Sequence, residues 1–128
     1  MEFPAELQSL SEILAFVRAP LERTHSQEVL ERLELVAEEA LVNIIQHGYA
    51  GNEGWITISC ISQNDSIVLN IQDGSIPFDW AKEIDRLKAF PELNSRKGCG
   101  LQLIAHYASH VSYERVSGKN CFSIHLTG

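Results

Sequence analysis

Two stretches in the N-terminal half of the chain repeat apolar residues at three- and four-residue steps, the pattern of an amphipathic helix. The first predicted helix starts near Pro4, because proline fits a first turn, and it ends or kinks at Pro20. Its apolar stripe consists of Leu7, Leu10, Ile13, Leu14 and Val17. The second starts after Ser26, a suitable N-cap, and closes around Gly48. Its broader apolar face consists of Val29, Leu30, Leu33, Val36, Ala37, Ala40, Leu41, Ile44 and Ile45.

Strands are predicted where apolar and polar residues alternate. Residues 55–61 and 66–71 form one candidate pair around an Asn-Asp turn, and residues 111–116 and 121–126 form another around a Gly-containing turn. Both pairs are therefore expected to be hairpins.

Two further helices are predicted between the hairpins, over residues 80–90 and 100–110. Strands joined by short turns pair antiparallel, and helices with apolar stripes need a surface to cover. The pattern therefore predicts an α/β fold, a two-layer sandwich in which a mixed, mostly antiparallel sheet is covered on one face by helices. One domain is expected to span residues 1–128.

Composition limits the classes of function. The chain has 128 residues, of which 45% are hydrophobic, and a formal net charge of -7. This acidic balance argues against non-specific binding to nucleic acid, which needs clustered basic residues. The chain does not open with a signal-peptide pattern, and no apolar run approaches the roughly 20 residues of a membrane helix. Its three cysteines lack a C-x-x-C spacing, so we expect reduced thiols in a soluble cytoplasmic protein without a membrane partner.

Polar residues at steps of four interrupt the apolar second helix. Glu39, Asn43 and His47 share one face of it. Burying these groups without partners would cost roughly 1–3 kcal/mol each. We therefore expect a ligand or a solvent-filled cavity beside them. The alternative is that the row faces solvent and the helix is simply amphipathic.

An Asp-Gly pair, Asp73 and Gly74, follows the second predicted strand. The Asp73 carboxylate could accept a hydrogen bond from a ligand amine, while Gly74 would let a ligand approach the backbone. The same pair is also an ordinary way for a strand to end.

Two glycines, Gly98 and Gly100, lead into a helix near Leu101. Such a helix start offers unpaired amides and a partial positive charge to a phosphate, and Arg96 and Lys97 add cationic donors beside it. The pattern lacks the third glycine of a dinucleotide-binding fingerprint and the Lys-Ser/Thr ending of a P-loop. Taken alone, it also suits a plain joint between a loop and a helix.

Together and in this order, the Glu-x-x-x-Asn helix, the Asp-Gly loop and the Gly-x-Gly-Leu helix start resemble the ATP-binding boxes of the GHKL superfamily, which has the Bergerat fold. The resemblance covers nearly the whole chain. The run Glu-Ala-Leu-Val-Asn-Ile-Ile-Gln-His-Gly-Tyr and the later Pro-Phe-Asp resemble, more specifically, the anti-sigma-factor serine/threonine-protein kinases of bacterial partner-switching systems. The first loop departs from the family's Asp-x-Gly pattern, because the glycine follows Asp73 directly as Gly74 and Ser75 stands where that pattern has its glycine.

This resemblance implies a site for ATP with Mg²⁺. Asn43 would hold Mg²⁺, Glu39 would act as the general base, and Asp73 would accept from the adenine amino group. Gly98 and Gly100 would belong to a lid over the phosphates. The other nucleotide-binding residues implied are His47, Gly74, Arg96, Lys97 and Leu101.

The resemblance also implies partners. The protein would be an anti-sigma factor that binds a sigma factor, and an ATP-dependent kinase that phosphorylates a serine of an anti-anti-sigma antagonist protein. It could also form a homodimer. The alternative is a non-catalytic, nucleotide-binding switch that sequesters a regulatory partner, and a third possibility is an α/β domain without a nucleotide site.

Overall fold

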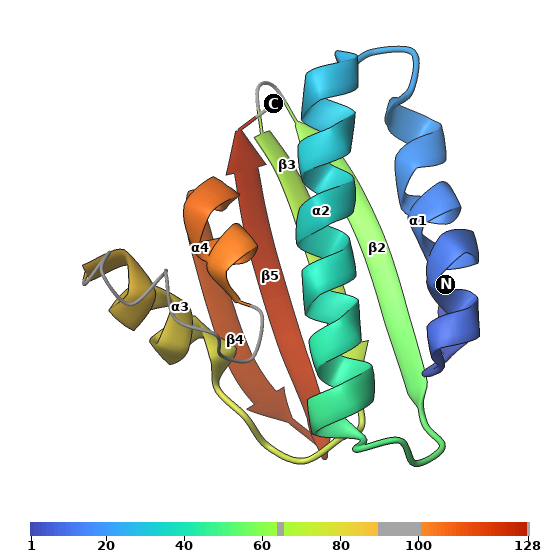
Figure 1. Ribbon diagram of the computed structural model, residues 1–128, viewed down its shortest axis with the longest axis vertical. Helices are drawn as coiled ribbons and strands as arrows, with labels where there is room; N and C mark the ends of the chain where they lie inside the picture. Colours follow the sequence, from blue (N-terminus) through green and yellow to red (C-terminus); the bar gives the residue numbers. More distant parts are fainter. Residues whose placement is uncertain (64–65, 90–100, 128) are drawn as a thin grey trace.

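The computed structural model describes residues 1–63, 66–89 and 101–127. Its five strands form one sheet in the order β1-β2-β3-β5-β4, and each pair of neighbours is antiparallel. The strands are β1 (Glu2–Pro4), β2 (Trp55–Gln63), β3 (Ser66–Asp73), β4 (His110–Val116) and β5 (Lys119–Thr127). The predicted two-layer α/β fold is confirmed (Figure 1), and all the described pairings are antiparallel rather than mixed.

The helices are α1 (Leu10–Arg18), α2 (Gln27–Asn43), α3 (Trp80–Ala89) and α4 (Gln102–Tyr107). Figure 1 shows α1, α2 and α4 lying over one face of the sheet, with α3 beside α4 and β4. Alternate residues of the central strands are buried beneath these helices, among them Ile67, Leu69, Ile71, Phe122, Ile124 and Leu126. Burying each such side chain contributes about 1.5–3 kcal/mol, so this layer holds the helices on the sheet.

Helix α2 begins as the sequence predicts, because the Ser26 hydroxyl accepts a hydrogen bond from the Val29 backbone N–H at 3.3 Å. Its end differs from a regular α-helix. Residues Ile44–Gly48 form a π-helical turn, in which the Tyr49 N–H donates to the Ile44 carbonyl at 2.8 Å. A π-turn inserts an extra residue into the helical repeat and often lies at functional sites.

The N-terminal segment corrects the predicted helix start. Pro4 ends strand β1 instead of opening a helix, and a 3₁₀ turn over Leu7–Ser9 precedes α1. The reason lies in tertiary pairing: Phe3 is only 3% exposed in the core, and β1 adds to the edge of the sheet beside β2. An edge strand tolerates proline because one side of the strand needs no ladder partner.

The helix predicted over residues 100–110 is also shorter, because α4 ends at Tyr107. The Ser109 N–H donates to the His125 carbonyl at 2.8 Å, which draws the chain into the sheet, and His110 then begins β4.

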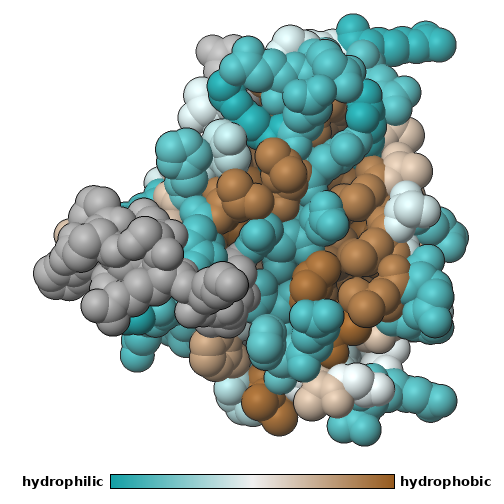
Figure 2. Space-filling view, viewed as in Figure 1, coloured by the Kyte–Doolittle hydropathy of each residue, from teal (hydrophilic) through white to brown (hydrophobic). Residues whose placement is uncertain are grey.

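Apolar surface remains on the helical side of the molecule. Figure 2, in the orientation of Figure 1, shows hydrophobic surface over the region of α1 and α2. Leu35 of α2 retains 40% of its exposure and Phe16 of α1 retains 38%. None of the helices in the described part of the chain is long and apolar enough to cross a membrane.

Candidate functional site

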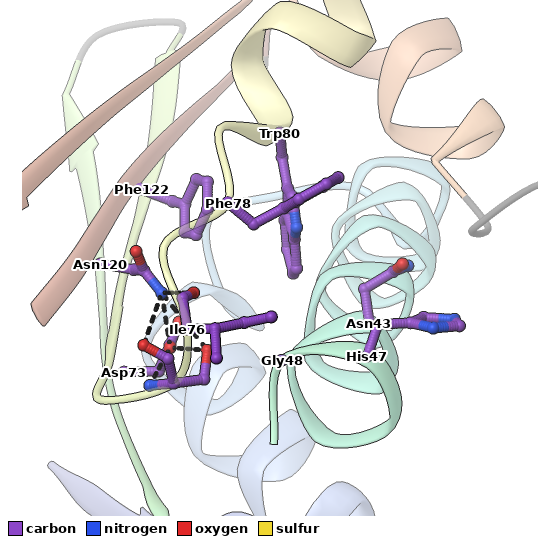
Figure 3. A pocket seen from close by; sticks show the side chains of 10 residues that line it. Asn43, His47, Gly48, Asp73, Ile76, Phe78, Trp80, Asn120 and Phe122 are labelled. Carbon is purple, nitrogen blue, oxygen red and sulfur yellow. Dashed lines mark hydrogen bonds between the residues drawn. The ribbon is translucent and has the colours of Figure 1, made fainter. Parts of the chain in front are cut away.

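A cavity of about 330 Å³ lies between the C-terminal end of α2 and the adjoining ends of β3 and β5. Its lining residues are Asn43, His47, Gly48, Asp73, Ser75, Ile76, Phe78, Trp80, Asn120 and Phe122. Figure 3 shows Asn43 and His47 on the helical side and Asp73 and Asn120 on the strand side. An apolar wall with a few polar groups is the usual make-up of a small-ligand site, and this volume falls within the usual range.

Asp73 is the last residue of β3 and is fully buried. Its Oδ1 accepts three hydrogen bonds: from the Ser75 N–H at 2.9 Å, from the Ser75 hydroxyl at 2.5 Å and from Asn120 Nδ2 at 3.0 Å. Its Oδ2 is buried and has no hydrogen-bond partner among the described residues. Leaving a buried acceptor unpaired costs about 1–3 kcal/mol, so Oδ2 is an atom that a ligand donor would satisfy.

Asn120 reaches Asp73 because the two residues are directly opposite in the register of β3 and β5. Its side chain is almost fully buried and also donates to the Ile76 carbonyl at 2.9 Å. Its Oδ1 accepts from the Tyr113 hydroxyl at 2.7 Å and from Arg115 at 3.0 Å, both on the edge strand β4. The carboxylate is therefore connected through one amide to the outermost strand of the sheet.

Tyr49 fixes the turn that follows Asp73. Its hydroxyl accepts from the Gly74 N–H at 2.8 Å and donates to the Trp55 carbonyl at 2.7 Å. Gly54 makes room for the ring, since a Cβ there would lie 2.2 Å from it. Gly74 itself is exposed and is absent from the described lining of the cavity, although it adjoins Asp73.

Of the predicted polar row Glu39, Asn43 and His47, only the last two line the cavity within the described ranges. Asn43 is 3% exposed, lines the cavity and donates through Nδ2 to the Glu39 carbonyl at 2.8 Å. His47 also lines the cavity but lies in the π-turn and is exposed. Glu39 stands one turn before Asn43 and is not among the residues found lining the cavity in the described ranges.

Glu39 nevertheless has an unusual environment. Its Oε2 is buried and finds no hydrogen-bond partner within the described ranges. Burial raises the pKa of this carboxyl above its ordinary value, and the neighbouring negative charge of Glu38 raises the pKa further. A carboxyl whose pKa is raised by burial is a candidate proton acceptor.

Comparison with known proteins agrees with this geometry. Residues 3–126 match the histidine kinase-like ATPase domain family. The chain belongs to the histidine kinase-like ATPase family. It is 31% identical to the anti-sigma F factors of Bacillus thuringiensis (strain Al Hakam) and Bacillus mycoides (strain KBAB4), over 98% of this chain and 90% of each relative. The anti-sigma F factor of Bacillus cytotoxicus matches to the same extent. The resemblance inferred from the sequence motifs is thereby confirmed.

Several predicted site residues of this ATPase-family chain lie outside the described residues, namely Arg96, Lys97, Gly98 and Gly100. Leu101 is described and is 1% exposed, immediately before α4. It belongs to the hydrophobic core and does not line the cavity as far as the described residues define it.

The sequence did not single out most of the cavity wall of this family member. Trp80 and Phe122 stack with ring centroids 4.5 Å apart, and Phe78 meets Trp80 edge-on at 6.3 Å. Together with Ile76 they form the apolar side of the site. The aromatic residues alone carry no spacing signal. If the strand that ends at Asp73 had been paired antiparallel with the last predicted strand, Asn120 would have been placed opposite Asp73.

Proposed function

We propose that the protein binds ATP with Mg²⁺ in the cavity at the end of α2. The observation that carries this proposal is Asp73 Oδ2, a buried acceptor without a partner in the described structure, on the wall of an otherwise largely apolar cavity. An adenine base has a flat apolar face and an exocyclic amine, which suits the Trp80 and Phe122 side chains and this oxygen. The ATPase family of the chain supports the same ligand.

Among the described residues, the site offers one protein ligand for Mg²⁺, the side chain of Asn43. Asn43 Nδ2 is engaged with the Glu39 carbonyl, which leaves Oδ1 as the atom that could contact a cation. No group of three or more His, Cys, Asp or Glu side chains in the described ranges could hold a metal. Mg²⁺ is commonly bound by one or two protein oxygens, water and the substrate's phosphates, so a single amide is sufficient. The ion would neutralise phosphate charge when bound.

The remaining nucleotide contacts are also part of the proposal. His47 at the cavity rim would lie near the phosphates, and Gly74 would keep the backbone next to Asp73 accessible. We keep Arg96, Lys97, Gly98, Gly100 and Leu101 as the lid and its helix start, on the family resemblance alone.

We further propose that the protein is an anti-sigma factor and a serine kinase of an anti-anti-sigma antagonist, acting in the cytoplasm as a homodimer. The names of the anti-sigma F factors to which it is similar support a sigma factor as one partner. In the transfer, the oxygen of a substrate serine would bond the γ-phosphorus, and ADP would leave with the bridging oxygen. Glu39 would accept the serine proton, a role that its raised pKa favours.

The test combines purified protein, [γ-³²P]ATP with Mg²⁺, and the antagonist protein isolated with this chain from its native cells. Label on an antagonist serine is expected. Glu39→Ala should lose the label while keeping its affinity for ADP, because Glu39 is proposed to act on the proton and not on the nucleotide. Label that survives in Glu39→Ala would overturn the assignment of the base.

A second candidate function is a non-catalytic, nucleotide-binding switch that sequesters its partner. It is favoured by the position of Glu39, which does not line the cavity in the described structure. The same experiment separates the two. Binding of ADP with no labelled serine on any isolated partner supports the switch, whereas labelled antagonist supports the kinase.

A further inference from the structure

The nucleotide site contains a buried polar network for which the sequence motifs give no role. It connects Asp73, Ser75 and Asn120 with Tyr113 and Arg115 of the edge strand (Figure 3 shows the part around Asp73). Asp73, Ser75 and Asn120 are each at most 8% exposed. Buried networks of this kind are stable only when their groups are paired, which makes the single unpaired acceptor, Asp73 Oδ2, informative.

The orientation of the Asn120 amide follows from its neighbours. Arg115 can only donate hydrogen bonds, so the Asn120 atom that it contacts at 3.0 Å must be the oxygen. The nitrogen therefore faces Asp73. An NH₂ group carries two hydrogens, and its two shortest contacts, to Ile76 O at 2.9 Å and to Asp73 Oδ1 at 3.0 Å, account for both.

This orientation decides which oxygen of Asp73 is available. Ser75 and Asn120 together direct three donors to Oδ1. A carboxylate held in this way cannot rotate without giving up all three hydrogen bonds. Oδ2 is consequently held in one position, as the acceptor left for a ligand.

We propose that Asn120, oriented by Tyr113 and Arg115, is a positioning residue that presents Asp73 Oδ2 to the exocyclic amine of the base and so sets specificity for a 6-aminopurine nucleotide. This inference rests on the proposed nucleotide function of the cavity. Asn120 acts through Asp73 and does not itself contact the amine. Removing the Asn120 side chain should therefore weaken the discrimination between purines with and without the 6-amino group, and should leave phosphate binding unchanged.

The test compares two ligands, Mg-ADP and the Mg complex of purine riboside diphosphate, which lacks the 6-amino group. Isothermal titration gives the ratio of their dissociation constants for each variant. One well-placed hydrogen bond to a charged group should make wild type prefer ADP by about 10-fold or more. In Asn120→Ala this ratio should fall at least about 5-fold, while the affinity for purine riboside diphosphate changes by less than about 2-fold.

Two further variants keep the result interpretable. Tyr113→Phe retains the ring that packs on Phe122 and removes only the hydroxyl that orients Asn120, so a smaller fall in the same ratio is expected even if Asn120→Ala does not fold. Ser123→Ala is the matched control on β5, because its hydroxyl bonds Asn70 away from the cavity, and its ratio should equal that of wild type.

The outcomes separate this inference from the proposed function. Absence of ADP binding in wild type overturns both. Binding with a ratio that falls in Asp73→Asn but stays unchanged in Asn120→Ala and Tyr113→Phe overturns the role of Asn120 and leaves the nucleotide site intact. An equal loss of affinity for both ligands in Asn120→Ala would mean a purely structural role and would also overturn the inference.

Discussion

Ser75 fills the space that Gly48 leaves at the end of the π-turn after α2: a Cβ on Gly48 would lie 2.5 Å from Ser75 Oγ and 3.0 Å from Ser75 Cβ. This relationship explains how the chain accommodates serine at the position where the family pattern Asp-x-Gly has its glycine. The hydroxyl occupies this space and donates to Asp73 at 2.5 Å. The departure from the family pattern therefore adds a hydrogen bond to the proposed base-binding carboxylate instead of disrupting it.

Gly48→Ala should lower the free energy of unfolding by about 1–3 kcal/mol, because the added methyl group overpacks against Ser75. Gly48 does not have a positive φ, so the backbone itself accepts alanine. In a Ser75→Gly background the same change should be neutral or stabilising by up to about 1 kcal/mol, the usual gain of alanine over glycine in a helix. Urea unfolding of wild type, the two single variants and the double variant measures the coupling. An equal cost in both backgrounds would contradict the packing argument.

Tyr49→Phe should destabilise the protein by about 1–3 kcal/mol, since it leaves the Gly74 N–H and the Trp55 carbonyl without their partner. The turn after Asp73 loses its anchor, so affinity for ADP should also decrease. Chemical denaturation and titration with ADP check both effects. Tyr107→Phe is the control, because it removes a hydroxyl from α4 outside this turn. It should change the free energy of unfolding and the affinity for ADP less than Tyr49→Phe does.

The pH dependence of stability should report the environment of Glu39. Its pKa is raised above 4.5 in the folded protein by burial and by Glu38. The folded state thus binds this proton more tightly than the unfolded chain. The stability that the group contributes is present below pH 4.5 and is lost as the pH rises through the folded pKa.

Glu39→Gln should therefore gain stability relative to wild type as the pH rises from 4.5, and the gain should level off above the folded pKa. Urea unfolding across this range measures it. In a Glu38→Gln background the transition should move to lower pH, because one cause of the raised pKa is removed. A difference between Glu39→Gln and wild type that does not change with pH would show that Glu39 has an ordinary pKa.

Tryptophan fluorescence should report on the cavity. The chain has two tryptophans: Trp80 lines the cavity, whereas Trp55 lies beside Gly74 with Lys119 over its ring. Binding of Mg-ADP should change the emission of Trp55→Phe, in which Trp80 remains. The change should be absent or much smaller in Trp80→Phe. The reverse assignment would place the ligand away from the described cavity.

Much of the fold could be predicted from local pattern. The cap at Ser26, the apolar face of α2 and the two hairpins depend on spacing and turn chemistry. The structure confirms the cap, the apolar face and the antiparallel pairing of both predicted strand pairs, whereas the predicted Asn-Asp turn lies outside the described residues. Strand β1 could not be predicted in this way, because Glu2–Pro4 gains its partner only from residues more than fifty positions away. The π-turn likewise leaves no composition signal in Ile44–Gly48.

In the candidate site, too, some residues could be predicted from local sequence pattern and others could not. Asn43, His47 and Asp73 carried a recognisable motif, and all three line the cavity. Asn120 and Trp80 carried none, because their positions depend on strand register and on how α3 starts against the sheet. Residues that act through tertiary pairing are the ones that sequence spacing does not identify.

The most direct test of the central claim is isothermal titration of the wild-type protein and Asp73→Asn with Mg-ADP. Asp73→Asn keeps an oxygen for the donors from Ser75 and Asn120 but replaces Oδ2, so the fold should be retained. Wild type should bind Mg-ADP at one site, and binding to Asp73→Asn should be at least about 10-fold weaker. Absence of binding to wild type at millimolar ADP, or equal affinity in the two proteins, would contradict the central claim.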